Sequence, residues 1–438
     1  MTNFAVLFKM WCLKRHSILL LLALLLCGGV ARGQDYPWLS NNNIMVEARA
    51  HAGVFWHHHF EMKRYDAHYP AVEVSIYQNT YGKNEWEAVY NYPYIGVTLY
   101  HANFGINFEH NAEVGEALGS VFALYPFINY PLNPDENSQI TFKLGVGLGF
   151  LTKPFDNLNN YHNFSIGSHL NAAVNLSFEY RQRITPRLMS VASFGLTHFS
   201  NGSTKLPNYG LNTFSIAWGM AYYLRKPRVN LTPAQRPEYK PFEFDHKHWF
   251  SVDLDYGIGF KNVSQTLGGD STHFYRVHEL STYLLAQFTQ YSRAGVSLSA
   301  ALDLSDQTLP DHFRDQNGLH IKKFNFNTGQ NDIYDISTLQ MTKINLGLCY
   351  VMNMERLAFF FEVGWHLRYN NFTDFSKGNV YQKVKCRYQV YDNVYAHLSL
   401  MTHFGRADYL CFGLGYRLNQ KYYINHEKGT RRHPPGLH

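Results

Sequence analysis

The feature that most constrains this 438-residue sequence is a regular alternation of apolar residues with small or polar ones. Between residues 140 and 150 every second residue is large and apolar, and the residues between them are Thr, Lys or Gly. Because successive side chains of an extended strand point to opposite faces, the pattern predicts strands with one apolar face and one small or polar face. Strands of a membrane barrel have this character when lipid lies outside and a packed interior lies inside.

Turn residues divide the first half of the chain into about eight such strands. Eight strands form the smallest barrel whose interior is filled by its own side chains. The sequence therefore predicts an all-β fold, an outer-membrane antiparallel β-barrel within residues 34–226. We expect its strands near residues 44–55, 71–80, 92–102, 114–127, 139–151, 165–180, 187–200 and 212–225.

The second half of the chain repeats the alternation. A polar, proline-containing stretch at residues 227–247 has the composition of a linker. Residues 248–424 then hold about eight further strands, and residues 425–438 form a polar tail. The break between the halves favours a second barrel-like unit, with one larger barrel made by both halves as the alternative. The sequence assigns no role to this second half.

The N-terminus predicts export. Three basic residues precede an apolar run from Ile18 to Leu26, and a small-x-small site follows at residues 31–33. We interpret residues 1–33 as a cleaved signal peptide, because the run is too short to span a bilayer as a helix. The formal net charge is +6, but four of the Lys and Arg residues lie in this peptide. The exported chain is therefore only weakly basic, and we expect no nucleic-acid partner.

A short motif on the seventh predicted strand carries a base and a nucleophile. In His198-Phe199-Ser200 the imidazole and the hydroxyl share one face of an extended strand, roughly 6 to 7 Å apart. A base that leans toward a hydroxyl is the arrangement of a nucleophilic hydrolase. Phe194 and Leu196 have the same parity, so the pair lies on the apolar face. A catalytic pair that faces lipid implies a lipid substrate.

This motif resembles the signature of a known family, the outer-membrane lipid A 3-O-deacylases (PagL-type). That signature reads His-(aromatic)-Ser-Asn and then Lys-x-Pro-Asn-x-Gly, and residues 198–210 match it without a gap. The resemblance covers roughly residues 44–225. It implies an esterase that removes an ester-linked 3-hydroxyacyl chain from lipid A of lipopolysaccharide, in the outer membrane of a Gram-negative bacterium.

The resemblance also implies a role for each residue of the motif. Ser200 is expected to be the nucleophile, with His198 as the general base. Asn212 occupies the third catalytic position. We expect oxyanion and loop contacts from Asn201 and Gly202, and substrate contacts from Lys205 and Asn208.

Position 212 departs from the family, which has a Glu there. An Asn accepts a hydrogen bond from the imidazole but cannot stabilise imidazolium by charge, and the comparable exchange in a serine protease costs about 10⁴ in rate. The alternative is therefore a non-enzymatic structural or channel-forming outer-membrane barrel with a degenerate deacylase site. A third interpretation makes the second half the working part, as a channel or an adhesin.

The remaining candidates for chemistry we interpret as structural. Three cysteines, Cys349, Cys386 and Cys411, have no metal-like spacing, and the histidines at 57–59 point to alternate faces, so we expect no metal and no cofactor. Residues 400–405 echo the catalytic motif, but His403 there has the parity of the barrel interior. The expected partners are lipid A or lipopolysaccharide and outer-membrane lipid, and the sequence is compatible with a homodimer.

Overall fold

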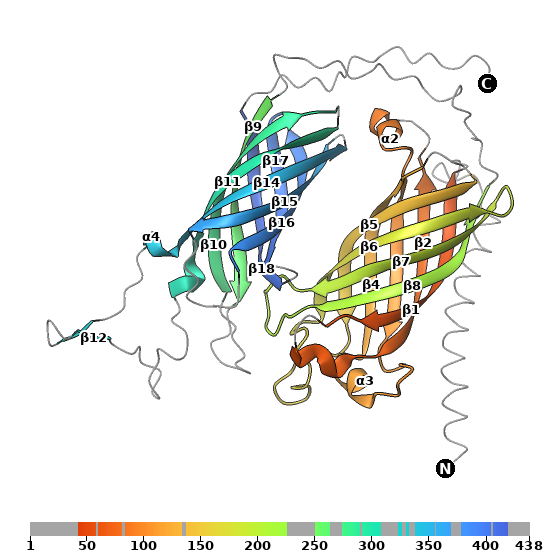
Figure 1. The fold of residues 1–438 in the computed structure, drawn as a ribbon, viewed down its shortest axis with the longest axis horizontal. Coiled ribbons are helices and arrows are strands. Elements are labelled where there is room, and N and C mark those ends of the chain that lie inside the picture. Colours follow the sequence, from red (N-terminus) through yellow and green to blue (C-terminus); the bar gives the residue numbers. More distant parts are fainter. Residues whose placement is uncertain are drawn as a thin grey trace.

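Two closed antiparallel barrels of eight strands each form most of the part of the chain that the structure describes (Figure 1). The predicted signal peptide, linker and polar tail lie outside the residues that the structure describes. The structure, a computed structural model, describes residues 43–57, 60–80, 84–133, 137–225, 250–262, 274–289, 291–307, 323–325, 330–332, 338–354, 356–368, 378–403 and 406–418.

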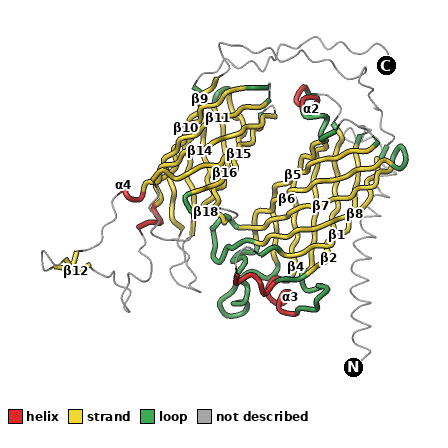
Figure 2. The backbone as a smooth tube through the Cα atoms, viewed as in Figure 1, coloured by secondary structure: helices red, strands yellow, loops and turns green. Residues whose placement is uncertain are grey.

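The first barrel pairs its strands in chain order, and β8 closes the sheet against β1. Its strands are β1 (Ile44–Phe55), β2 (His68–Asn79), β3 (Tyr94–Asn103), β4 (Ser120–Pro131), β5 (Ser138–Leu151), β6 (Leu170–Arg183), β7 (Leu188–Ser200) and β8 (Leu211–Tyr223). A 3₁₀-helix η1 (Phe60–Tyr65) and two short helices, α2 (Glu85–Val89) and α3 (Ala112–Leu118), lie in its loops. Loops and helices gather at the two ends of the barrel (Figure 2).

The prediction of a strand that begins near residue 114 is wrong, because those residues form α3. The side chain of Asn111 caps this helix by accepting a hydrogen bond from the amide of Glu113 at 3.1 Å. Gly119 ends it at a φ of 63°, a conformation that glycine adopts without steric cost. The buried residues of α3 are Val114, Ala117 and Leu118, which have the i, i+3, i+4 spacing of a helix. The helix is short, so in the sequence its apolar residues resemble the start of the next strand.

The second barrel is also closed, which confirms two barrels rather than one larger one. Its strands are β9 (Phe250–Asn262), β10 (Phe274–Gln287), β11 (Ser292–Asp303), β14 (Thr342–Met354), β15 (Leu357–Arg368), β16 (Val380–Tyr391), β17 (Val394–His403) and β18 (Arg406–Arg417). Between β11 and β14 lie η3 (Leu304–Gln307), a small pair formed by β12 (Lys323–Asn325) and β13 (Gln330–Asp332), and α4 (Thr338–Met341).

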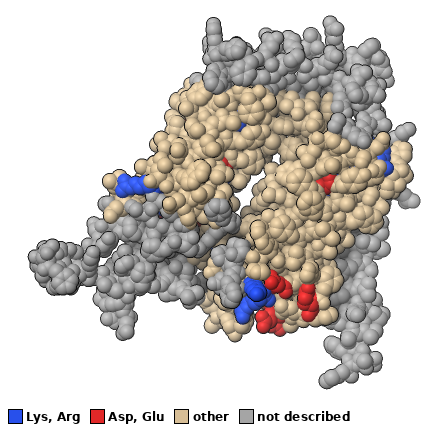
Figure 3. Space-filling model, in the orientation of Figure 1, with Lys and Arg blue, Asp and Glu red and all other residues tan. Residues whose placement is uncertain are grey.

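The outer faces of both barrels are apolar, as the alternation predicts. On β5 the outward-facing Leu148 and Phe150 are 58% and 47% exposed, while the inward-facing Thr141 and Lys143 are buried. The space-filling view shows barrel sides almost without charged residues (Figure 3). Within the described residues, no helix is long and apolar enough to cross a membrane.

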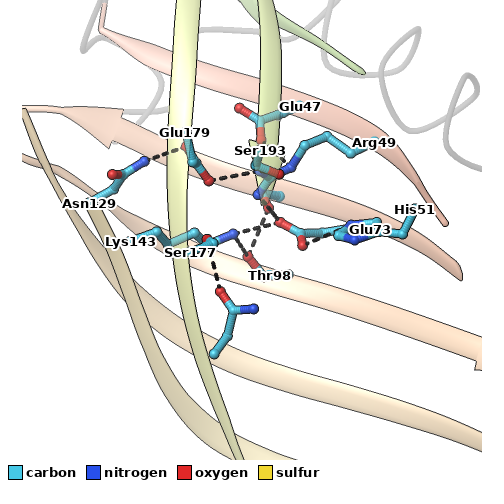
Figure 4. A network of polar contacts seen from close by, with 12 residues as sticks. Glu47, Arg49, His51, Glu73, Thr98, Asn129, Lys143, Ser177, Glu179 and Ser193 are labelled. Carbon is cyan, nitrogen blue, oxygen red and sulfur yellow. Dashed lines mark hydrogen bonds and ion pairs between the residues drawn. The ribbon is translucent and has the colours of Figure 1, made fainter. Parts of the chain in front are cut away.

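The interior of the first barrel is filled by a buried ion network, here called the Arg49 network: Glu47, Arg49, Glu73, Lys143, Glu179 and Arg181. Figure 4 shows the first five of these residues. Arg49 pairs with Glu179 at 2.7 Å, with Glu47 at 2.9 Å and with Glu73. Aromatic and aliphatic side chains form buried clusters above and below. Because every charge faces an opposite one, the network offsets part of the cost of removing these groups from water.

The two barrels lie side by side (Figure 1). Side chains and loops join them at both ends. At one end Trp86 and Ile128 of the first barrel cluster with Met352 of the second. At the other end the loop between β7 and β8 meets the end of β9, where the amide of Asn262 donates to the carbonyl of Ser203 at 2.7 Å. Because β7 and β9 both run toward this end, the barrels point in the same direction. We call it the Ser200 end.

Candidate active site

His198 and Asn212 form a hydrogen-bonded pair on the outer face of the first barrel. The antiparallel register of β7 and β8 places the two residues directly opposite each other. Nδ1 of His198 lies 2.6 Å from Oδ1 of Asn212. Because a carbonyl oxygen only accepts, Nδ1 carries the proton, and Nε2 keeps a lone pair as a base requires. Asn212 thus selects the tautomer that a carboxylate would select at this position.

Ser200 lies at the end of β7, on the face opposite the interior residue Phe199. Its side chain is nearly covered, because the residue is only 3% exposed. The hydroxyl donates to Oδ1 of Asn208 at 3.3 Å and accepts from Nδ2 of the same residue at 3.1 Å. Both Ser200 and His198 are described in full, and no hydrogen bond joins them. The structure therefore places base and hydroxyl on one strand but leaves the hydroxyl bonded to Asn208.

Two backbone amides converge on this hydroxyl region. The amide of Gly202 donates to Oγ of Ser200 at 3.3 Å, and the amide of Asn201 donates to Oδ1 of Asn208 at 3.0 Å. Gly202 has a φ of +64°, in the left-handed region that favours glycine. The Asn201 side chain is used within the protein, since its Nδ2 donates to Oγ of Ser168 at 2.9 Å. The oxyanion donors expected at 201 and 202 are thus available only from the backbone.

Sequence reasoning missed the part played by Asn208 and Gly210. Asn208 was expected to contact substrate, but its amide caps the Ser200 hydroxyl. Gly210 has a φ of +79°, and a Cβ there would lie 2.7 Å from Cε1 of His198. A side chain at 210 would displace the imidazole. Both residues fall inside the motif at residues 198–210, so the motif could have indicated that they belong to the site.

Residues 71–221 match the family model for lipid A 3-O-deacylase (PagL), and residues 250–420 match the model for the acyloxyacyl hydrolase C-terminal domain (PagL_C). The chain belongs to the PagL family. The two matches fall on the two barrels in turn. No curated protein matches the sequence.

Two solved structures resemble single barrels of this PagL-family chain. Neisserial surface protein A has a TM-score of 0.29 and 9% identity, over 41% of this chain and 96% of its own. The outer membrane enzyme PagL has a TM-score of 0.28 and 13% identity, over 40% of this chain and 97% of its own. These scores are too low to assign function.

A cavity of about 560 Å³ opens beside the catalytic motif, between the β5–β6 loop and the β7–β8 loop. Lys205 and Lys153 line it together with Asp156 and His169. Asp156 does not substitute for the missing Glu, because its carboxylate accepts from the amides of Asn159 and Leu158. These hydrogen bonds hold the pKa of Asp156 below its usual value.

The echo of the motif in the second barrel does not rebuild the site. His403 faces the interior, as its parity predicts, and its Nε2 lies 2.9 Å from Nε2 of His366. Cys349, Cys386 and Cys411 form no disulfide. His57 pairs with Asp66, and residues 58 and 59 lie outside the described part of the chain. Among described residues, no group of three or more His, Cys, Asp or Glu side chains is arranged to hold a metal ion.

Proposed function

We propose that this PagL-family chain is an outer-membrane esterase that removes an ester-linked 3-hydroxyacyl chain from lipid A through Ser200 and His198. The observation that carries the proposal is the His198–Asn212 pair, which leaves Nε2 of His198 basic, two residues along the same strand from a serine hydroxyl that already accepts from a backbone amide. The membership of the family supports the outer membrane as its location. Export by a cleaved signal peptide in a Gram-negative bacterium belongs to the same proposal.

In the proposed reaction the ester carbonyl binds next to Ser200, and the Ser200 hydroxyl exchanges its hydrogen bond to Oδ1 of Asn208 for one to Nε2 of His198. The Ser200 oxygen attacks the carbonyl carbon while Nε2 of His198 takes the hydroxyl proton. The amide of Gly202 and Nδ2 of Asn208 are the nearest donors to the developing oxyanion. When the intermediate collapses, the bond between the carbonyl carbon and the sugar oxygen breaks, and His198 gives its proton to that oxygen, which leaves as a sugar hydroxyl. Water then hydrolyses the acyl-serine by the same two proton transfers and releases a 3-hydroxy fatty acid.

Lys205 is proposed to bind an anionic part of the substrate. Lipid A carries phosphate groups on its sugars, and Lys205 lines the cavity that adjoins the loop of the motif. This position also fits the proposed orientation of lipid A, with its sugars at the end of the barrel and its acyl chains along the apolar side of the barrel. Asn208 touches Ser200 directly, so its contact with substrate would be made at the ester itself.

The filled interior counts against the channel-forming alternative for the first barrel. Glu73, Lys143 and Arg49 cross the barrel at mid-height and are all buried. In the second barrel Asp253, Asp255 and Arg387 do the same. Barrels of eight strands are of the size that side chains fill.

Mass spectrometry of lipid A tests the proposed function. Purified full-length protein in detergent is incubated with hexa-acylated lipid A, and heat-unfolded protein is the control. The expected result is a loss of one 3-hydroxyacyl mass from lipid A, with an equal amount of free 3-hydroxy fatty acid, in the folded sample alone. Lipid A of unchanged mass in both samples would contradict the deacylase and leave a structural barrel.

The Asn212→Glu variant is expected to deacylate about tenfold faster than the wild type. Asn212 already holds the correct tautomer of His198, so the gain in rate comes only from stabilising the imidazolium by charge. It is therefore smaller than the roughly 10⁴-fold change in rate in a serine protease, where the exchange also loses the correct tautomer. Initial rates of fatty acid release measure it. Asn212→Ala is the matched control and should be slower than wild type. Equal rates for all three variants would show that position 212 does not act through His198.

A further inference from the structure

The second barrel is hydrogen-bonded to the β7–β8 loop, which carries the candidate oxyanion donor, the amide of Gly202. Oγ of Ser203 donates to the carbonyl of Ala407 on β18 at 2.7 Å, and the amide of Asn262 on β9 donates to the carbonyl of Ser203 at 2.7 Å. Ser203 has a φ of 62°, which is unfavourable for a residue with a side chain. The two hydrogen bonds from the second barrel help to hold this conformation, which lies one residue after Gly202.

Two leucines of the second barrel reach the loop next to the serine. Leu400 on β17 and Leu410 on β18 are paired across the two strands and both face outward. A Cβ on Gly202 would lie 3.4 Å from Cβ of Leu410 and 3.8 Å from Cδ1 of Leu400. Gly202 itself lies two residues after Ser200 and donates to its hydroxyl. An acyl chain bound at Ser200 on the outer face therefore lies beside these leucines.

Among the described residues, the hydrogen bonds and the buried cluster that join the two barrels lie at the barrel ends. Further along the outer face of β18, Phe412 and Leu414 are 53% and 62% exposed, and on β7 Phe194 is 60% exposed. At the opposite end, the hydroxyl of Tyr90 donates to the carbonyls of Tyr291 and Asn353. Between these two contacts the space-filling view shows an opening between the barrels (Figure 3). The walls of this opening are the apolar outer faces of both barrels, which favour contact with lipid chains over contact with water.

We propose that the second barrel forms one wall of the acyl-chain site, and that Leu400 and Leu410 determine which chains are accepted. The inference rests on the proposed function, because it takes Ser200 as the attacking group. The occupant is the long acyl chain of the membrane glycolipid whose ester Ser200 cleaves. A long chain extends from the ester along the two leucines, whereas a chain of a few carbons ends before it gains much of this contact. The second barrel thus gives the enzyme its preference for long-chain esters.

The test compares the hydrolysis of p-nitrophenyl myristate and p-nitrophenyl butyrate by the full-length protein at one fixed detergent concentration. Leu410→Trp narrows the site and is expected to lower the myristate-to-butyrate ratio of kcat/KM by about tenfold, the order of effect that lost apolar pocket contacts produce. The control is Leu298→Trp, on the outer face of β11, where Leu298 is 53% exposed. It should keep the wild-type ratio.

A second variant covers the case in which tryptophan disturbs the barrel. The double variant Leu400→Ala and Leu410→Ala removes the wall without adding bulk and should lower the same ratio severalfold. A wild-type ratio in both the tryptophan variant and the alanine variant would overturn the inference. The proposed function would stand in that event, provided that Ser200→Ala hydrolyses neither ester. If the wild-type protein hydrolyses neither ester nor lipid A, the proposed function fails and the inference falls with it.

Discussion

Replacing Ser200 with alanine should lower the rate of lipid A deacylation by about 10⁴-fold or more. The reason is that the proposed reaction passes through an acyl-serine. The next two hydroxyls along the loop already donate to backbone carbonyls, that of Ser203 to Ala407 and that of Thr204 to Asn201. Loss of the nucleophile in a comparable serine hydrolase lowers the rate by at least this factor. The activity that remains comes from the oxyanion donors and from substrate binding. The release of 3-hydroxy fatty acid by purified protein measures the rate.

Ser190→Ala is the matched control for this variant. Ser190 lies on the same strand and the same outward face, and its Oγ accepts a hydrogen bond from Nε1 of Trp218 at 3.0 Å. Its loss should change the rate by less than about twofold, since surface substitutions away from a site are usually worth little. A Ser200→Ala variant that is folded and keeps more than about a tenth of wild-type activity would show that another group attacks the ester.

The architecture was predictable from the sequence because the strands of these barrels obey one simple rule. On β5 every predicted outward residue from Ile140 to Phe150 faces outward, and Lys143 faces inward as expected. That rule works since each strand separates lipid from a packed interior, so every position has only two environments. It fails where the chain leaves the membrane, and α3 is the example: its seven residues follow a helical period that a short window cannot separate from alternation.

The candidate site was predictable only in part. Parity places His198, Ser200 and Asn212 on one face, and the strand register then pairs His198 with Asn212. Parity does not reveal what covers that face. The sequence favoured a serine exposed to lipid, but Ser200 is buried under the amide of Asn208. The contacts of the β7–β8 loop with the second barrel join Ser203 to Asn262 and to Ala407, 59 and 204 positions away, and no local pattern encodes such separations.

Removing the carboxylate of Glu73 is expected to destabilise the first barrel by about 3–5 kcal/mol, the cost of leaving buried charge without its partner. Glu73 is 2% exposed and contacts Arg49 as well as Nζ of Lys143 at 2.5 Å. Arg49 keeps Glu47 and Glu179 in the Glu73→Ala variant. Lys143 loses its ion pair with Glu73 and keeps a hydrogen bond to Oγ1 of Thr98 at 3.1 Å (Figure 4). The free energy of unfolding, measured by denaturant titration in lipid vesicles, gives the effect.

The exposed pair between Arg64 and Glu113 is the control, because its atoms lie 4.0 Å apart and both side chains contact solvent. Glu113→Ala should cost less than about 1 kcal/mol. A second test removes both opposite charges, with Glu73→Leu and Lys143→Met together. Since Nζ of Lys143 lies 4.3 Å from the centre of the Phe127 ring, a methionine there has an apolar neighbour, and the double variant should regain at least about half of the lost stability. A double variant no more stable than Glu73→Ala would show that packing at position 73, rather than the unpaired charge of Lys143, accounts for the loss.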